Sequence, residues 1–264
     1  MERPSSVRSA APLYGFRAVR GADAGADAWS ARRLEAVATL LLARHGLTDL
    51  TGPVLAGWTP GVHLSAAGRA QAESLAARLT GVRLDAVVSS PLERCQETAQ
   101  AVVAGRALPI ETDPGFGECG YGDWTGRPLR ELAAEPLWQV VQAHPSAAVF
   151  PGGEALADMQ RRAVAAVRAW NDRLGEKAVY LVCTHGDVIK SIVADALGLH
   201  LDQFQRITAD PASVMVIRYT ALRPFLLKLN DVGELRVTGG SEDKDGGENP
   251  TGSDAAVGGG SGTT

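Results

Sequence analysis

The chain has 264 residues, of which 45% are hydrophobic and 21% are charged, and its formal net charge at pH 7 is −4. This length accommodates one domain of roughly 200 residues with flanking segments, and no apolar stretch approaches the roughly 20 residues that a membrane-spanning helix needs. Residues 239–264 hold five acidic residues and one lysine, so the rest of the chain is neutral overall. We therefore expect neither nucleic acid nor a membrane as a partner.

The two ends of the chain differ in composition from its middle. Residues 1–36 are rich in Ala, Gly and Arg without a clear hydrophobic period, and residues 239–264 are rich in Gly, Ser and acidic residues. Segments of this kind bury too little apolar surface to fold alone. We expect a poorly ordered N-terminal extension over 1–36, one domain over 37–238 and a disordered tail over 239–264. A natural start of the chain near Val37 is an alternative explanation of the extension.

Two short apolar runs each end in a His-Gly pair. LLARHG ends an expected strand over residues 38–43, and LVCTHG ends another over residues 178–183. Apolar strands of this length are typical of a buried parallel sheet, and the residues after their carboxyl ends lie where α/β folds bind ligands. We predict a site that contains His45 and His185. Each is followed by a glycine that permits close backbone approach, Gly46 and Gly186.

Between and after these pairs, strands, turns and helices alternate. In the first half we expect a helix over 65–79 with Ser65 as N-cap, a strand over 86–88, a helix that carries Arg94 and is capped at Ser89-Ser90-Pro91, and a strand over 108–111. A loop over 113–126 and helical pieces over 128–143 follow. In the second half we expect helices over 154–174 and 188–197 and strands over 214–219 and 225–230. This order predicts an α/β fold. A homodimer that forms through the edge of the final strand pair is an alternative that the sequence leaves open.

The residues beside the two histidines suit phosphate chemistry. Arg44 precedes His45, and Arg94 also follows a strand end, so two planar guanidinium groups can converge on one phosphate. A neutral His45 is a competent nucleophile toward phosphorus. A protonated His185, with the helix that follows it, would stabilise the charge on the transferring group.

Protonation of the leaving alkoxide calls for a carboxylic acid in a water-poor loop. Glu118 is the best candidate because Phe116, Tyr121 and Trp124 flank it. The sequence leaves three rival carboxylates open: Asp113, Asp123 and Glu131.

These blocks together resemble the histidine phosphatase superfamily, in its phosphoglycerate mutase-like branch, over roughly residues 37–219. The opening motif of that family is similar to LLARHGLTDLT here. The resemblance implies His45 as the phosphorylated nucleophile, Arg44 as a phosphate ligand and Thr48 close by. Many members carry an asparagine where Thr51 stands, and a threonine can still donate one hydrogen bond at that position.

Three further blocks extend the resemblance. VVSSPLERCQETA implies Arg94 as the second phosphate-binding arginine, ECGYGDWTG implies Glu118 as the proton donor, and LVCTHGDVI supplies His185. The fold that the resemblance implies is a three-layer α/β/α sandwich with a mostly parallel central sheet. It implies a small phosphorylated metabolite as substrate, with no cofactor and no metal.

The reaction stays open among three alternatives. We expect a metal-independent phosphatase that hydrolyses a small phosphomonoester through a phosphohistidine on His45. A phosphomutase of the phosphoglycerate type is the first alternative, but such enzymes usually carry a more basic insertion after the glutamate block. The segment here offers Arg127 and Arg130 but no further Lys or Arg through residue 150. A non-catalytic phosphate- or partner-binding module is the second alternative. The presence of all five groups that the reaction needs argues against it: Arg44, His45, Arg94, Glu118 and His185.

The substrate itself is left open among sugar phosphates, phosphoglycerate and nucleotide-like ribosides such as α-ribazole phosphate. The loop over 52–63 and the segment over 128–151 are expected to form the specificity wall. Their large side chains predict a partly apolar pocket: Trp58, Leu137, Trp138 and Phe150.

The remaining histidines and the cysteines are interpreted as structural. None of the histidines outside the site ends an apolar strand, so we expect them in loops or on the surface: His63, His144 and His200. The cysteines form an odd set without metal-ligand spacing and are expected to be buried small apolar groups in a cytoplasmic protein: Cys95, Cys119 and Cys183.

Overall fold

The computed structural model describes residues 36–233. Apart from residue 36, the predicted N-terminal extension lies outside the described residues, as does the predicted tail over 239–264. The strands are β1 (Ala36–Arg44), β2 (Ala86–Ser89), β3 (Ile110–Thr112), β4 (Ala178–Thr184), β5 (Val214–Thr220) and β6 (Phe225–Asp231). The helices are α2 (Ala66–Arg78), α3 (Glu93–Val103), α4 (Leu129–Leu132), α5 (Pro136–Ala143), α6 (Leu156–Leu174) and α7 (Gly186–Leu197), with 3-10 turns η1 (Pro114–Phe116), η2 (Gly122–Trp124), η3 (Pro145–Ala147) and η4 (Leu201–Arg206). Over residues 36–233 none of these helices could span a membrane.

The six strands form one mixed sheet in the order β3-β2-β4-β1-β5-β6. The first four of these are mutually parallel, whereas β5 runs antiparallel to β1 and β6 antiparallel to β5. In the central pair, Ala38 lies opposite Ala178 and Arg44 opposite Thr184. The carboxyl ends of β1, β4 and β2 therefore meet at one edge of the sheet, as the sequence predicted for a mostly parallel arrangement.

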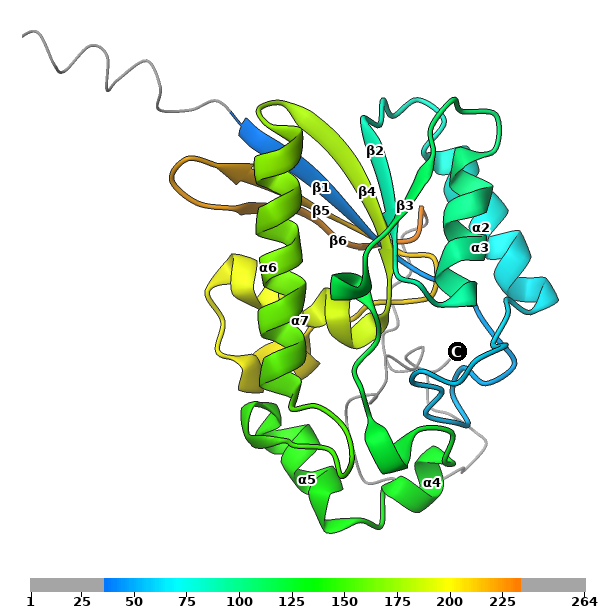
Figure 1. Cartoon of the computed structure of the whole chain (residues 1–264), viewed down its shortest axis with the longest axis vertical. Helices are drawn as coiled ribbons and strands as arrows, with labels where there is room; N and C mark the ends of the chain where they lie inside the picture. Colours follow the sequence, from blue (N-terminus) through cyan, green and yellow to red (C-terminus); the bar gives the residue numbers. More distant parts are fainter. Residues whose placement is uncertain (1–35, 234–264) are drawn as a thin grey trace, which may run out of the picture. The chain divides into compact units, whose positions relative to one another are not determined.

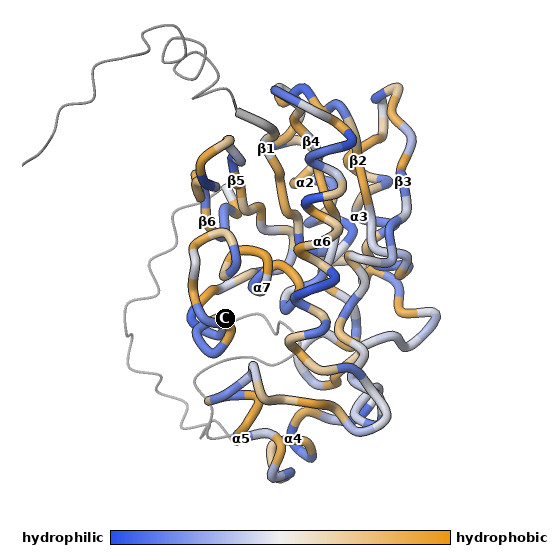
Figure 2. The backbone as a smooth tube through the Cα atoms, turned by 60° about the vertical axis from the view of Figure 1, so that its left-hand side comes forward, coloured by the Kyte–Doolittle hydropathy of each residue, from blue (hydrophilic) through white to orange (hydrophobic). Residues whose placement is uncertain are grey.

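Both faces of the sheet are covered by helices, which confirms the predicted three layers. Alternate residues of a strand point to opposite faces. Leu40 and Leu42 accordingly pack in the core that includes residues of α6 and α7, while Leu41 and Ala43 pack in the core that includes residues of α2 and α3. Figure 1 shows these helix pairs on the two sides of the sheet. The central strands β1 and β4 are hydrophobic over most of their length in Figure 2, because neither of their faces meets water.

The helix starts differ in part from the predictions. The Ser65 hydroxyl accepts the Gly68 N–H at 3.1 Å, so the predicted cap of α2 is confirmed. The predicted serine cap of α3 is wrong, because α3 starts after Leu92 with no side-chain cap. The helix predicted from residue 154 begins at Leu156, whereas that predicted from residue 188 already begins at Gly186. The turn η4 has no counterpart among the predictions.

Two peripheral features bear on function. Figure 1 shows α4 and α5 beyond the end of the sheet at which β1, β2 and β4 finish. At one side edge of the sheet, β6 carries three exposed apolar side chains: Phe225, Leu227 and Leu229.

Candidate active site

The site begins at the adjoining carboxyl ends of β1, β4 and β2. Arg44 ends β1 and His45 follows it, and the backbone N–H of His45 donates to the Thr184 carbonyl at the end of β4 (3.0 Å). His185 comes directly after Thr184, and Ser90 comes directly after β2. The ring centroids of His45 and His185 lie 5.3 Å apart. The structure thus brings together the two histidines that the sequence places 140 residues apart.

Gly46 lets the segment after His45 pack directly on the backbone of α2. A Cβ on Gly46 would lie 2.4 Å from the carbonyl oxygen of Gly68, and a Cβ on Gly68 would lie 1.9 Å from that of Leu47. Neither position has room for a side chain. The N–H of Gly46 donates to Thr98 Oγ1 of α3 at 3.1 Å. The close approach predicted for Gly46 is therefore to another part of the chain, and it fixes the peptide next to the His45 ring.

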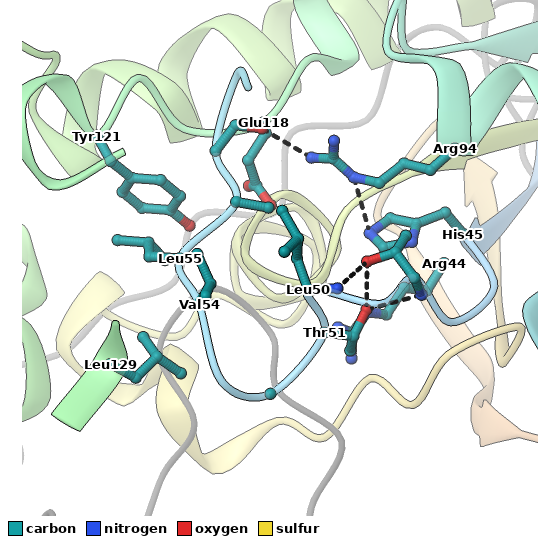
Figure 3. Close-up of a pocket in the computed structure, with 14 residues that line it drawn as sticks. Arg44, His45, Leu50, Thr51, Val54, Leu55, Arg94, Glu118, Tyr121 and Leu129 are labelled. Atoms are coloured by element: carbon teal, nitrogen blue, oxygen red, sulfur yellow. Dashed lines mark hydrogen bonds between the residues drawn. The ribbon is translucent and has the colours of Figure 1, made fainter. Parts of the chain in front are cut away.

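Hydrogen bonds define the tautomer of His45. Its Nδ1 lies 2.7 Å from the Gly46 carbonyl oxygen, which can only accept, so Nδ1 carries the proton. Its Nε2 accepts from Arg94 Nε at 3.3 Å and therefore carries the lone pair (Figure 3). Burial, followed by the charges of Arg94 and Arg44, lowers the pKa of His45 well below its usual value of 6.5. The ring is neutral near pH 7, with Nε2 as its nucleophilic nitrogen.

Two buried guanidinium groups flank this ring. The side chains of Arg44 and Arg94 belong to residues that are each 1% exposed. Arg44 Nη1 donates to the Ala209 carbonyl (2.7 Å), and Arg94 Nη2 donates to the Gly57 carbonyl (2.9 Å) and lies 3.2 Å from His185 Nδ1. Arg44 Nε and Arg94 Nη1 have no hydrogen-bond partner within residues 36–233. Because none of these partners is a carboxylate, the pair forms a buried cationic site that suits an anion.

His185 is fully buried at the inner side of Arg94. Since a guanidinium can only donate, His185 Nδ1 accepts from Arg94, and the proton on Nε2 is donated to Ser90 Oγ at 2.8 Å. Burial, followed by the charges of Arg94 and His45, lowers the pKa of His185 well below its usual value of 6.5. The ring is therefore neutral near pH 7. The protonated ring was predicted for a His185 that faces a phosphate, and that state stays a prediction.

Glu118 is the acidic group of the site and is 3% exposed. Its Oε2 lies 3.7 Å from His185 Nδ1, and its Oε1 accepts the N–H of Cys119 at 2.9 Å. Burial, followed by the charge of Asp187, raises the pKa of Glu118 to about 7. Asp187 is itself buried in the first turn of α7 and accepts a hydrogen bond from the Tyr121 hydroxyl at 2.8 Å. A carboxyl group with such a pKa can hold a proton at neutral pH and still release it, as a general acid must.

Arg162 of α6 holds the loop that carries Glu118. It donates to three main-chain carbonyls of residues 115–118 at 2.8–2.9 Å and pairs with Glu154 at 2.6 Å. Trp58 Nε1 donates to the same Glu118 carbonyl at 2.6 Å. The position of Glu118 therefore depends on groups from two distant parts of the chain, the start of α6 and the loop that carries Trp58.

The rival carboxylates lie away from the pocket. Asp113 accepts hydrogen bonds from the Gly115 N–H (2.8 Å) and from Trp170 Nε1 (2.7 Å), so it has a structural partner on each oxygen. Asp123 and Glu131 are exposed to solvent. None of the three belongs to the residues that line the pocket, whereas Glu118 does.

Thr48 and Thr51 lie in the turn that follows His45, and both line the pocket. Thr51 Oγ1 accepts the N–H of Thr48 at 3.0 Å, and the two hydroxyl oxygens lie 3.0 Å apart. Thr51 therefore stabilises this turn, and a contact between either hydroxyl and phosphate stays a prediction.

The pocket encloses about 400 Å³ of empty space, part of it open to solvent. Its polar end is formed by Arg44, His45, Arg94 and Glu118. Its opposite wall is apolar and comes from the loop after β1 and from α4: Val54, Leu55 and Leu129, with Leu50 between this wall and the polar end (Figure 3).

The observed apolar wall of the pocket differs from the predicted specificity wall in its residues. The loop over 52–63 does contribute, but from the segment over 128–151 only Leu129 lines the pocket. Trp138 and Phe150 are 4% and 1% exposed and pack in the core, with Leu137 against that core. They were expected at the pocket because they are large and lie in the right segment. Trp138 of α5 and Phe150, which follows η3, instead point into the core, where Trp124 contacts both.

Other predicted groups behave as structural residues. The side chains of the three remaining histidines are 59%, 73% and 69% exposed, which confirms their surface location: His63, His144 and His200. The three cysteines are buried free thiols, as predicted. In the part of the chain that the structure describes, no group of three or more His, Cys, Asp or Glu side chains could hold a metal ion.

Sequence reasoning missed several residues that position the reacting groups. Ser90 was read only as a helix cap, although its hydroxyl lies against His185. Thr98, Arg162 and Asp187 were not singled out. Thr98 and Asp187 lie within blocks that the sequence analysis quotes, and Arg162 lies in the expected helix over 154–174. No local pattern shows which side chains of these segments turn toward the site.

Comparison with known proteins identifies close similarity across this domain. A family model described as the histidine phosphatase superfamily (branch 1) matches residues 40–232. The adenosylcobalamin/alpha-ribazole phosphatase of Escherichia coli K12 is 33% identical over 168 residues, which cover 61% of this chain and 79% of that protein. Phosphoserine phosphatase 1 of Hydrogenobacter thermophilus is 30% identical over 170 residues, covering 63% and 80%. The crystal structure of the alpha-ribazole phosphatase from Shigella flexneri matches with a TM-score of 0.66 at 26% identity, covering 75% of this chain and 99% of that one.

Proposed function

Because this chain belongs to the histidine phosphatase superfamily and is an enzyme of the phosphoryl-transfer type, we propose that it hydrolyses a small phosphate monoester through a phosphohistidine on His45, without a metal ion. The observation that carries the proposal is the neutral His45 ring, whose unprotonated Nε2 accepts a hydrogen bond from the buried Arg94 in a pocket that the buried Arg44 also lines. A nucleophile and an anion site are thereby joined in one pocket.

Substrate binding places the phosphoryl group against Arg44 and Arg94. The unpartnered Arg94 Nη1 and Arg44 Nε are free to donate to its oxygens, which offsets the cost of burying them. The dianion also raises the pKa of the adjacent His185, so that His185 Nδ1 can take up a proton and donate it to the same group. These cations supply the charge neutralisation that other phosphatases obtain from a metal ion.

In the first step, His45 Nε2 attacks phosphorus and the bond between phosphorus and the leaving oxygen breaks. Glu118, protonated at neutral pH, gives its proton to that oxygen, and the alcohol departs. In the second step, water attacks the phosphorus of phospho-His45 and the Glu118 carboxylate takes a proton from it. The phosphorus–nitrogen bond breaks, orthophosphate leaves, and both residues return to their starting states.

The segment after the glutamate block favours hydrolysis over a phosphoglycerate-type mutase. Arg127 is bonded to Glu135 at 2.8 Å, and Leu129 is the one residue of α4 that lines the pocket. The exposed Arg130 does not line the pocket either, so the segment contributes no basic side chain to its lining for the retention of a bisphosphate intermediate. Related proteins are named as phosphatases of alpha-ribazole phosphate and of phosphoserine, which supports a small phosphorylated metabolite as the substrate class.

The test is phosphate release from a panel of phosphomonoesters in EDTA, with the wild type and His45→Ala compared and 3-phosphoglycerate isomerisation followed in the same samples. We expect release by the wild type and its loss in the variant. Isomerisation without net release would identify a mutase, and a folded wild type with neither activity would favour a binding module.

Two accompanying expectations stay predictions. A homodimer would use the edge strand β6, whose exposed Phe225, Leu227 and Leu229 suit a partner surface. A reducing compartment such as the cytoplasm suits three buried free thiols.

A further inference from the structure

We propose that the organic part of the substrate is an uncharged alcohol with an apolar or aromatic body, and that esters with a second anionic group, such as a carboxylate, are poor substrates. This inference rests on the proposed function, because it takes the phosphoryl group to lie at His45. It concerns the opposite end of the same pocket.

The composition of the pocket wall carries the inference. Beyond the phosphate-binding end, the wall is formed mainly by aliphatic side chains and small residues: Leu50, Val54, Leu55, Ala56 and Leu129. Such a surface stabilises an apolar group by removing it from water. Its aliphatic side chains offer a carboxylate no hydrogen-bond donor in exchange for its hydration, and the hydroxyl of Tyr121, which also lines the pocket, already donates to Asp187.

The two cations of the pocket are already committed. Arg44 and Arg94 are the basic residues in its lining, and hydrogen bonds to the carbonyls of Ala209 and Gly57 hold them at the His45 end. Among residues 36–233, no further cation of the lining would then pair with a carboxylate at the far wall.

The nearest basic residues along the chain do not supply that partner. Arg127 is paired with Glu135, and Arg130, which follows Leu129, is exposed; neither lines the pocket. The pocket also contains Glu118, and the buried Asp187 contacts Tyr121 of the lining at 2.8 Å. Neither carboxyl group offers a carboxylate a partner of opposite charge, and Glu118 in its ionised form repels a second anion.

The test compares two esters with the same reacting group, benzyl phosphate and 4-carboxybenzyl phosphate, with 3-phosphoglycerate and phosphoserine alongside. We expect kcat/KM for benzyl phosphate to exceed that for each carboxylated ester on the order of 100-fold. Equal values, or a preference for any of the carboxylated esters, would overturn the inference.

A matched pair of variants tests whether the wall is the cause. Leu129→Lys places a cation on the wall, whereas Leu129→Met changes its shape and keeps it apolar. We expect the ratio of carboxybenzyl to benzyl phosphate activity to rise at least about tenfold in the lysine variant relative to the methionine variant. The same ratio in both variants would count against the inference.

Binding separates this inference from the proposed function. Calorimetry with His45→Ala compares the affinity of the two benzyl esters without turnover. If the wild type hydrolyses no ester, the proposed phosphatase activity fails, but tighter binding of benzyl phosphate would still support the apolar pocket. If the wild type hydrolyses esters and the carboxylated one binds equally well, the pocket inference alone fails.

Discussion

Replacing Glu118 by glutamine should stabilise the protein at alkaline pH while it removes the proposed acid. The folded protein raises the pKa of this carboxyl from 4.5 to about 7, mainly because it is buried. Each pKa unit corresponds to about 1.4 kcal/mol, so the ionised carboxylate costs the folded state about 3 kcal/mol above pH 7. Glutamine has a similar shape and carries no charge, so the variant does not have this cost.

The sign of the effect follows from the raised pKa. Well below pH 4.5 the carboxyl is protonated in both the folded and the unfolded chain, so Glu118 does not lower the free energy of unfolding of the wild type. As the pH rises toward 7, the unfolded chain releases the proton before the folded chain does, so the wild type loses stability. The loss is complete above about pH 7.

Urea denaturation of the wild type and Glu118→Gln at pH 5 and pH 8 measures this difference. We expect the free energy of unfolding of the variant, relative to the wild type, to increase by roughly 2–3 kcal/mol between the two pH values. The exposed Glu131 offers a control, since Glu131→Gln should show no comparable change. A variant whose relative stability is the same at both pH values would refute the reasoning that burial sets the pKa of Glu118.

Three further changes test other parts of the site. Asp187→Asn removes a charge that raises the pKa of Glu118, so the basic limb of the kcat/KM profile should move to lower pH; an unchanged or higher limb would contradict that role. Arg94→Lys keeps the charge and loses the planar fork, so kcat/KM should fall roughly 10²- to 10³-fold, and a loss of less than about tenfold would show that charge alone suffices. Gly68→Ala puts a Cβ 1.9 Å from a backbone oxygen and should lower the free energy of unfolding by about 1–3 kcal/mol. Gly81→Ala is the control, because open space surrounds Gly81 and the free energy of unfolding should not fall. Equal effects of the two variants in thermal unfolding would refute the packing argument.

The fold was predictable because its strongest determinants are local. The apolar runs that end at Arg44 and Cys183 are hydrophobic on both faces of the sheet, a pattern that buried parallel strands require. The order of the elements then fixed the layers. Element boundaries were less predictable: the Ser90 hydroxyl, a plausible cap for α3, lies against His185 instead, a contact between residues 95 positions apart.

The reacting groups were predictable for a similar reason, since Arg44, His45 and His185 occur at strand ends that any parallel sheet brings together. The specificity wall was not. Trp138 and Leu129 lie in one segment, and hydrophobicity alone favours the larger side chain as a pocket residue. The positions of α4 and α5 decide their roles: Trp138 of α5 is buried in the core, whereas Leu129 of α4 lines the pocket.

The supporting network depends on contacts that no local pattern reveals. Arg162 reaches the loop that carries Glu118 across 44 residues, and Tyr121 reaches Asp187 across 66. The protonation states depend on the same distant contacts. The pKa of His185, for example, is lowered by its burial and by the charge of Arg94, and neither cause can be read from the block that contains His185.

The central claim is that His45 carries the phosphoryl group during turnover, and trapping that intermediate tests it most directly. Wild-type enzyme mixed with excess benzyl phosphate is quenched with alkali within milliseconds, and the peptides are analysed by mass spectrometry under conditions that preserve phosphohistidine. We expect phosphate on the peptide that contains His45, labile to acid and stable to base, and none in His45→Ala. Phosphate on another residue, or full turnover by the His45→Ala variant, would contradict it.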